Sequence, residues 1–224
     1  MARIIRYLAK IFGDYTLTPR STRLLITAGA WTPSVFSTLF PTSPLDIPIT
    51  QLAGYSLLVK SPRWTKEHES NGCYAIFTTM QSGFSPEVFS RIGGEIYLAG
   101  LNDPAMPLPE TATDAKIDQA KVDELTKAAQ RLLGRDGTDV SDLQVLREGL
   151  CFRPVTRRGE PILCRVADED LGGIETNPGA DGGVFIAAGH GPWGISHSLG
   201  TGKVMAEILE GQETSADVTH LALF

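Results

Sequence analysis

A turn with three glycines near the carboxyl-terminal end of the sequence constrains the fold more than any other stretch. Gly189, Gly191 and Gly194 lie within AAGHGPWGISHSLGTGK. An apolar run, GVFIAA, precedes them and predicts a buried strand, and GKVMAEILEG follows and predicts a helix. Because glycine adopts backbone conformations that are closed to other residues, the cluster predicts a tight strand-to-helix turn.

The spacing of these glycines matches G-x-G-x-x-G, the fingerprint of a dinucleotide-binding turn, but the surrounding sequence does not. That fingerprint requires a second strand after the helix, with an acidic residue about 20 residues beyond the glycines. Here Glu207 and Glu210 fall inside the predicted helix, and little sequence is left for a second strand. Pro192 and Trp193 would also crowd a phosphate. We therefore do not expect this turn to hold a pyrophosphate.

A helix that begins at such a turn can still favour a ligand through the electrostatics of its amino end. Its first backbone N–H groups are unpaired, and the positive end of its dipole faces whatever lies above the turn. An electron-rich or anionic group is favourable there. The alternative is that the glycines only let the last helix pack closely against the sheet, and the pattern alone does not decide between the two.

A second strand-to-helix turn lies near the other end of the sequence. RLLITAG, residues 23–29, predicts a buried strand, and Pro33 suits the first turn of a helix over WTPSVFSTLF. The middle of the sequence contains strand-like segments separated by Pro, Gly, Asn and Ser, and one clear helix with Asp114 as a candidate cap and Gly134 as its end.

Strand–turn–helix units that are separated in sequence can be neighbours in one sheet. We therefore expect an α/β fold with α+β character, in which an incomplete strand–turn–helix domain carries an inserted domain built on a mixed or antiparallel sheet. The expected ranges are residues 1–22 as an N-terminal helix or leader, 23–44 and 183–212 as the first domain, 45–182 as the inserted domain, and 213–224 as a tail.

Composition argues against several classes of partner. With a formal net charge of -6 and no long basic run, the chain lacks the surface typical of nucleic-acid binding. No apolar run approaches the roughly 20 residues needed to span a bilayer. Cys73, Cys151 and Cys164 are odd in number and form no C-x-x-C pair, which favours a reducing, cytoplasmic setting. His190 and His197 have no acidic ligand between them, so no metal site is expected.

Three segments together resemble FAD-dependent oxidoreductases of the D-amino-acid oxidase, glycine oxidase and sarcosine oxidase superfamily. They are LLITAGAWTPSVF, GLCFRPVTRRGEPIL and GVFIAAGHGPWGISHSLGTGKVMAEILEG, in the order and at about the spacing found there. The resemblance runs from about Arg23 to Gly211 and is greatest to the fungal, intracellular branch. It implies FAD as the cofactor and a small-molecule amine or amino acid as the substrate, whose C–N bond is oxidised by hydride transfer to the flavin.

The resemblance also implies that both turns lie against the cofactor. The first would pass beside FAD, and the second would end as a helix N-terminus under the pyrimidine edge of the flavin ring. It would hold the ring rather than the pyrophosphate, because helix N–H groups stabilise the negative charge that reduction places near N1 and O2. The implied residues are Ala28, Gly29 and Trp31 in the first turn and Gly189, His190, Gly191, Pro192, Trp193, Gly194 and Ile195 in the second.

Two further residues are implied in substrate binding. Arg153, followed by Pro154, matches an arginine that grips a substrate carboxylate with a bidentate fork. A structural arginine bound to backbone carbonyls or to an acid such as Glu148 is the alternative. Tyr55 is a candidate to line the pocket, and half-buried packing is the alternative for it. No catalytic side chain is expected, because a neutral amine needs no side-chain base.

The sequence departs from the superfamily at its start and in one internal run. Members begin with a strand, a Gly-rich turn and a helix that bind the ADP half of FAD, and residues 1–22 are too few for that unit. We therefore expect a shortened chain or a partner chain that completes the FAD domain. A non-catalytic remnant acting as a binding or trafficking-associated protein is the alternative function. Arg158 and Cys164 replace the usual Asp and Gly of the internal run, with an effect on flavin contacts or with none.

Overall fold

The computed structural model describes residues 21–81 and 83–223, which form two compact units. The first unit combines the chain up to Gln51 with the chain from Arg153 onward, and the second is Leu52–Phe152. Each has a hydrophobic core of its own. Apart from its last two residues, the expected N-terminal helix or leader lies outside the described residues.

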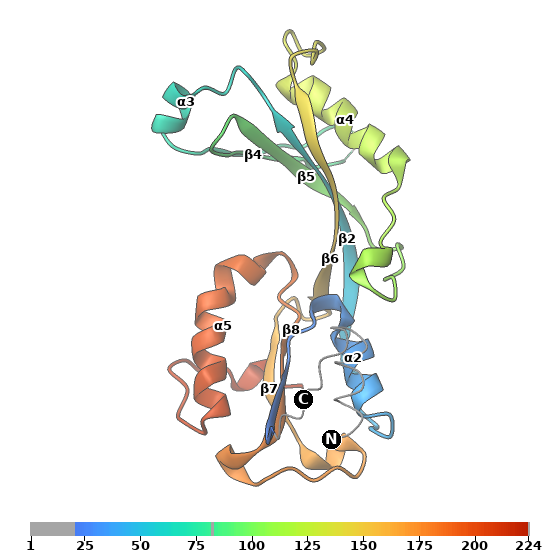
Figure 1. Cartoon of the computed structure of the whole chain (residues 1–224), viewed down its shortest axis with the longest axis vertical. Coiled ribbons are helices and arrows are strands. Elements are labelled where there is room, and N and C mark those ends of the chain that lie inside the picture. Colours follow the sequence, from blue (N-terminus) through green and yellow to red (C-terminus); the bar gives the residue numbers. More distant parts are fainter. Residues whose placement is uncertain (1–20, 82, 224) are drawn as a thin grey trace. The chain divides into compact units, whose positions relative to one another are not determined.

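The sheet of the first unit has three strands in the order β1-β8-β7 (Figure 1). β1 is Arg23–Ile26, β8 is Gly183–Ala188 and β7 is Ile162–Val166. β1 and β8 are parallel, with Ile26 opposite Ile186, whereas β7 and β8 are antiparallel. Two strand-to-helix units that are far apart in sequence therefore lie in one sheet, and the predicted α/β class is confirmed.

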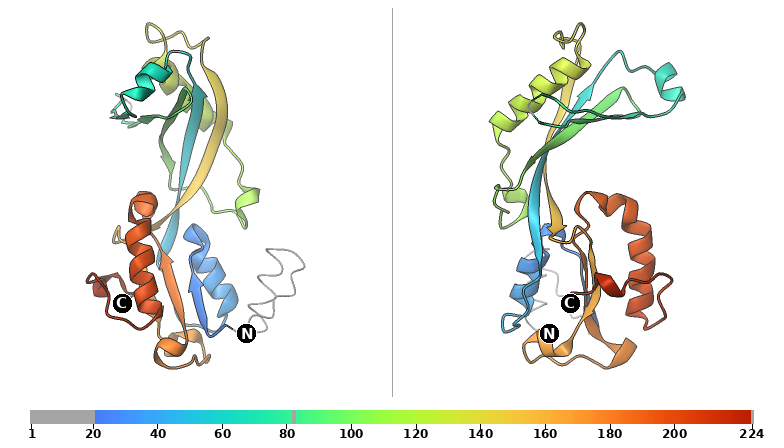
Figure 2. Two further views of the ribbon diagram at one scale, coloured as in Figure 1. Left: turned by 60° about the vertical axis from the view of Figure 1, so that its left-hand side comes forward. Right: turned by 180° about the vertical axis from the view of Figure 1, so that it is seen from behind.

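Helices cover both faces of this sheet (Figure 2). After β1 come a 3-10 turn, η1 (Gly29–Trp31), and α2 (Thr32–Leu39). After β8 come η5 (Gly191–Trp193) and α5 (Gly194–Leu209). Successive side chains of β8 point to opposite faces, so each helix has its own layer of core. The α2 layer includes Phe36, Leu39, Val184, Ile186 and Ala188, and the α5 layer includes Leu163, Phe185, Ala187 and Met205.

The second unit is built on a five-stranded sheet in the order β3-β4-β5-β2-β6. The β3–β4, β4–β5 and β2–β5 pairs are antiparallel. One face of the sheet packs against α4 (Gln119–Leu133) through the apolar side of that helix. The strands are β2 (Ile49–Lys60), β3 (Ala75–Phe77), β4 (Glu87–Ser90), β5 (Glu95–Asp103) and β6 (Gln144–Thr156).

The start of α4 differs from the sequence expectation. Asp114 lies in a separate 3-10 turn and does not cap the helix. The cap is Asp118, whose carboxylate accepts a hydrogen bond of 2.9 Å from the Ala120 N–H. The predicted end at Gly134 is confirmed. The remaining short elements are α3 (Lys66–Ser70), η2 (Ala112–Asp114), η3 (Asp168–Leu171), η4 (Gly179–Asp181) and η6 (Thr219–Leu221).

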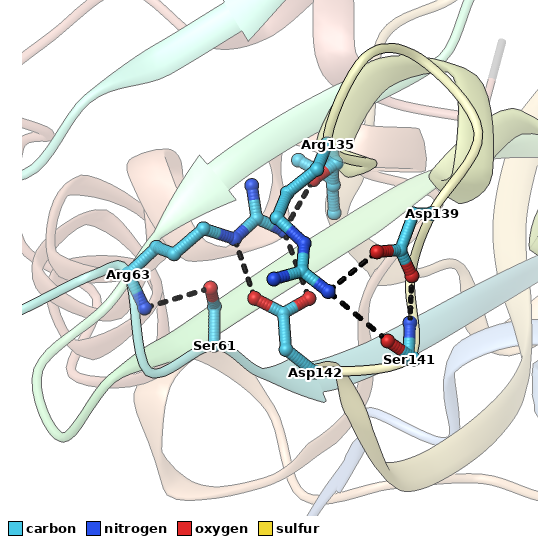
Figure 3. Close-up of polar contacts among 7 residues, drawn as sticks. Ser61, Arg63, Arg135, Asp139, Ser141 and Asp142 are labelled. Atoms are coloured by element: carbon cyan, nitrogen blue, oxygen red, sulfur yellow. Dashed lines mark hydrogen bonds and ion pairs between the residues drawn. The ribbon is translucent and has the colours of Figure 1, made fainter.

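Polar contacts fix the end of α4 (Figure 3). The guanidinium of Arg63 donates to the Leu133 carbonyl at 2.5 Å and to the Asp142 carboxylate at 2.7 Å. Arg135 forms an ion pair with Asp139 in the loop that follows. A cation at the carboxyl end of a helix complements the helix dipole, so these contacts have a structural explanation.

The second boundary between the two units lies at a different residue from the expected domain boundary. Residues 45–182 were expected to form the inserted domain, but residues from Arg153 onward belong to the first unit. The reason is β7, which pairs with β8 rather than with the second sheet. A short apolar strand has the same pattern whichever strand it pairs with, so the sequence does not reveal its partner.

Candidate functional site

The two glycine turns of the first unit meet at one edge of its sheet. We name residues 28–31 the GAW turn and residues 189–195 the GHG turn. β1 and β8 are parallel and in register, so the turns that follow them leave from the same edge. Gly29 and Gly189 each lie three residues beyond a matched pair of strand residues. The structure therefore brings the two turns together.

The glycines of these turns differ in what surrounds them. A Cβ atom at Gly189, where φ is +87°, would lie 2.7 Å from Cγ2 of Thr156, so close packing requires glycine there. At Gly29 a Cβ atom would meet nothing within 4 Å, and at Gly191 and Gly194 its nearest neighbour would be at 3.9 and 3.7 Å. Close packing against Thr156 of β6 thus explains Gly189, whereas Gly29 faces open space and Gly191 and Gly194 have only ordinary van der Waals neighbours.

The amino end of α5 is uncapped and surrounded by apolar surface. Trp193, at the cap position, makes no side-chain hydrogen bond to the helix, and the first helical turn contains no acidic residue. Trp193, Ile195 and Leu199 are 57%, 94% and 88% exposed. The positive end of a helix dipole beside apolar side chains suits a planar group with an electron-rich edge and apolar faces.

His190 links the GHG turn to two other elements. Its backbone forms a bridge with Val155 of β6, and its Nε2 atom lies 2.9 Å from Oγ1 of Thr201 in α5. Burial, and then the charge of His197, lower the pKa of His190 below its usual value. The lowered pKa favours the neutral form of His190, and its hydrogen bond joins the turn to the helix.

Thr32, directly after the GAW turn, has a buried hydroxyl without a partner. The residue is 0% exposed, and Oγ1 makes no hydrogen bond with any described residue. A buried hydroxyl left in this state costs about 1–3 kcal/mol. Thr32 begins α2 at the edge where both turns lie, and its hydroxyl is enclosed by the protein.

Arg153 lies on the strand that adjoins the GHG turn. It precedes Val155 by two residues on β6, and the backbone of Val155 pairs with that of His190. Its side chain is partly exposed and already has an interaction within the molecule. Contact of this side chain with a substrate carboxylate stays a prediction.

Tyr55 lies in the core of the second unit and is 1% exposed. It packs on the α4 side of the sheet among Leu57, Leu98 and Leu125. Its hydroxyl lies 3.4 Å from the sulfur of Met106, and burial is the main cause that raises its pKa. Packing accounts for this position, so we leave Tyr55 out of the proposed binding set.

Arg158 has a structural partner that the sequence did not indicate. Its guanidinium donates to the carbonyls of His220 and Ala222 at 2.9 and 3.0 Å, which holds the C-terminal segment against the first unit. Leu221 is buried between these two contacts. Cys164 lies in the core of the same unit, and burial raises its pKa to about 11. Tertiary packing thus explains both departures from the superfamily pattern.

Sequence reasoning missed three residues of this edge. Thr32 adjoins the GAW turn and was within reach of motif-based inference. Thr201 could not be inferred from a motif, because its contact with His190 depends on the angle between the turn and α5. Val155 could not be inferred either, because the strand that carries it was assigned wholly to the other domain.

The described residues contain neither a cluster of metal ligands nor a membrane-spanning helix. Within residues 21–81 and 83–223, no group of three or more His, Cys, Asp or Glu residues is arranged to hold a metal ion. In the same part of the chain, every helix is too short or too polar to cross a membrane.

Comparison with known proteins identifies relatives that are longer than this chain. TDA3 of Saccharomyces cerevisiae is 30% identical over 227 residues, a match that covers 96% of this chain and 37% of TDA3. A D-amino acid dehydrogenase of Allorhizobium ampelinum is 24% identical over 202 residues, covering 89% of this chain and 39% of the dehydrogenase. The chain thus spans less than half the length of these relatives.

Solved structures share the fold. Glycine oxidase from Geobacillus kaustophilus has a TM-score of 0.63 at 20% identity, covering 90% of this chain and 45% of the oxidase. Iminodiacetate oxidase from Chelativorans sp. BNC1 has a TM-score of 0.62 at 16% identity, covering 91% and 46%. The profile of one family, DAO, described as FAD dependent oxidoreductase, matches residues 7–208, which is most of the chain. The chain therefore belongs to the DAO family of FAD dependent oxidoreductases.

Proposed function

We propose that this chain holds the isoalloxazine ring of FAD against the GHG turn, as part of an oxidoreductase that oxidises the C–N bond of an amine or amino acid. The observation that carries the proposal is the meeting of two glycine turns at an uncapped helix N-terminus, with open space beside Gly29. Membership of a family of FAD dependent oxidoreductases supports FAD. The D-amino acid dehydrogenase and glycine oxidase among the similar proteins support an amine substrate.

The residues at this edge fit a flavin chemically. Backbone N–H groups of α5 would face the pyrimidine edge, and the side chains of Trp193 and Ile195 would cover apolar ring surface. No carboxylate in the first turn of α5 opposes negative charge there. When bound, the flavin would supply an acceptor for the hydride of the substrate.

The chain's own residues would then bind the cofactor and the substrate and orient them relative to each other. The dipole of α5 stabilises negative charge at its amino end, and the contact between His190 and Thr201 keeps the turn in place for it. Arg153 would grip a substrate carboxylate through two parallel N–H donors, a geometry that lysine does not offer. The binding set proposed for the cofactor is Ala28, Gly29, Trp31, Gly189, His190, Gly191, Pro192, Trp193, Gly194 and Ile195.

Titration of the 224-residue protein with FAD tests the cofactor. We expect saturable binding, a shift of the visible flavin bands and quenching of flavin fluorescence, because Trp193 lies within the proposed site. Trp193→Leu should relieve part of that quenching while binding persists. A folded protein that leaves both signals of added FAD unchanged contradicts the proposal and favours the non-catalytic alternative.

Comparison of FMN with FAD tests how much of the cofactor this chain holds. The chain covers 37% of TDA3, and we propose that a further segment or a partner chain binds the ADP half. FMN and FAD should then bind this chain with affinities within about threefold, because the ADP half gains no contacts. FAD binding that is more than tenfold tighter (about 1.4 kcal/mol) would show an ADP site within this chain.

Arg153→Met and Arg153→Lys test the substrate clamp. In the flavin-loaded protein, affinity for glycine should fall by about tenfold or more in both variants, because a bidentate ion pair is lost. Affinity for methylamine, which has no carboxylate, should not change. Equal effects on the two ligands would assign Arg153 a structural role.

We also propose a reducing, cytoplasmic setting, supported by the odd number of cysteines.

A further inference from the structure

We propose that His190 and His197 form a coupled pair that takes up one proton when negative charge develops at the amino end of α5, which makes the strength of ligand binding at the GHG turn depend on pH. The inference rests on the proposed function for the identity of that ligand, reduced flavin. It concerns two side chains for which neither the sequence motif nor the family assigns such a role.

The two imidazoles are close, and each has a distinct environment. Their ring centroids are 6.5 Å apart, and the His197 ring also lies 6.5 Å from the ring of Trp193 in a stacked orientation. His190 is half-buried in the turn, whereas His197 is exposed one helical turn further along α5. A proton on one ring therefore opposes a proton on the other.

These histidines are the titratable groups of the segment that begins α5. Residues 190–202 contain no Lys, Arg, Asp or Glu. The helix dipole disfavours a cation at this end. A negative group over the turn reverses the sign of that field at the rings, so it raises the proton affinity of both. Because binding and protonation are linked, protonation tightens binding by the same factor.

Charged groups on the packed elements are engaged elsewhere. On the β7 side, Arg165 lies 3.6 Å from Asp168, and in α5 Lys203 lies 3.7 Å from Glu207. Strand β8 and η5 contain no charged residue. Arg153 on β6 has an interaction of its own. None of these groups replaces the histidine pair as a proton acceptor between about pH 5 and 8.

The hydrogen bond of His190 survives a change of protonation state. A threonine hydroxyl either donates or accepts, so Thr201 can pair with Nε2 of His190 whether that nitrogen carries a proton or not. The pair can therefore gain a proton without moving the turn. When bound, the flavin would accept a hydride and carry one negative charge, and a neutral amine would leave as an iminium cation. A proton taken up from solvent by an imidazole would then balance the negative charge that remains at the site.

The experiment follows the imidazole C–H signals by NMR across pH 5 to 9 in three states: without FAD, with FAD, and with FAD reduced by dithionite. Without FAD, His197→Gln should raise the pKa of His190, because it removes the repelling charge. Reduction of bound FAD should raise the proton affinity of the pair by about tenfold, or one pKa unit. His220→Gln is the matched control and should alter neither result.

The outcomes separate this inference from the proposed function. An unchanged pKa of His190 in the His197→Gln protein overturns the coupling, and this measurement needs no flavin. If FAD binds and its reduction leaves both imidazole pKa values unchanged, the inference fails while the proposed function stands. If FAD does not bind at all, the proposed function fails, and the proton uptake inferred from it fails with it.

Discussion

The backbone of Val155 forms a β-bridge with the backbone of His190, and this contact joins the end of β6 to the GHG turn. It puts Arg153, the predicted substrate clamp, on a strand that directly neighbours the predicted cofactor turn. The contact lies wholly within the first unit. Substitutions of the residues around it can test the structural roles that the geometry assigns to them.

Gly189→Ala should destabilise the protein by about 2 kcal/mol or more, because it combines left-handed backbone strain with overpacking. The added Cβ atom would lie 2.7 Å from the Thr156 methyl group. Gly200→Ala is the matched control, since nothing lies within 4 Å of its Cβ position inside α5. The control should stabilise the helix by about 0.5–1 kcal/mol. Urea unfolding curves of the two variants measure the difference, and equal midpoints would contradict the packing assigned to Gly189.

Thr32→Val should stabilise the ligand-free protein by about 1 kcal/mol, because valine has a similar shape and no unpaired hydroxyl. Thr38→Val is the control, since the Thr38 hydroxyl is exposed and donates to the Ser34 carbonyl. The midpoints of thermal unfolding of the two variants and of the native protein, measured without FAD, give the comparison. A less stable Thr32→Val protein without FAD would mean that the hydroxyl has a partner.

Arg158→Met should release the C-terminal segment from the first unit. The substitution removes both donors to the carbonyls of His220 and Ala222, and the burial of Leu221 depends on that segment. Hydrogen exchange of residues 213–223 should become faster, while exchange in β8 should change little. Arg157→Met is the matched control. Unchanged exchange in the segment would show that Leu221 alone holds it in place.

Acid should weaken the loop that follows α4. The hydrogen bond from the Ser141 N–H is the main cause that lowers the pKa of Asp139 to about 2, with a smaller contribution from Arg135. A carboxyl group whose pKa is lower in the folded state stabilises it above the unfolded value near 4, and this contribution disappears as pH falls toward 2. Thermal midpoints between pH 5 and 2 should therefore fall less steeply in Asp139→Asn than in the native protein. Asp136→Asn, in the same loop, should follow the native curve.

Local patterns in the sequence predicted the parts of this fold that depend on neighbouring residues. The strands at residues 23–26 and 183–188, the turns after them and the end of α4 at Gly134 follow from apolar runs and glycine positions. The strand that pairs with β7 could not be predicted from the sequence, because the apolar residues of β7 suit either sheet. The Thr201 contact of His190 and the Arg158 contacts with the C-terminal segment depend on tertiary geometry, which no spacing encodes.

Binding of FAD to Ser196→Asp and Ser196→Asn tests the central claim most directly. Ser196 is the third residue of α5 and is exposed, so the new carboxylate lies at the positive end of the helix. Aspartate there should stabilise the ligand-free protein by about 0.3–1 kcal/mol. If the flavin ring lies over this end, the same charge should weaken binding of reduced FAD by about fivefold or more, and the asparagine variant should bind as the native protein does. A stabilised Ser196→Asp protein that binds reduced FAD as tightly as the native chain would contradict the account.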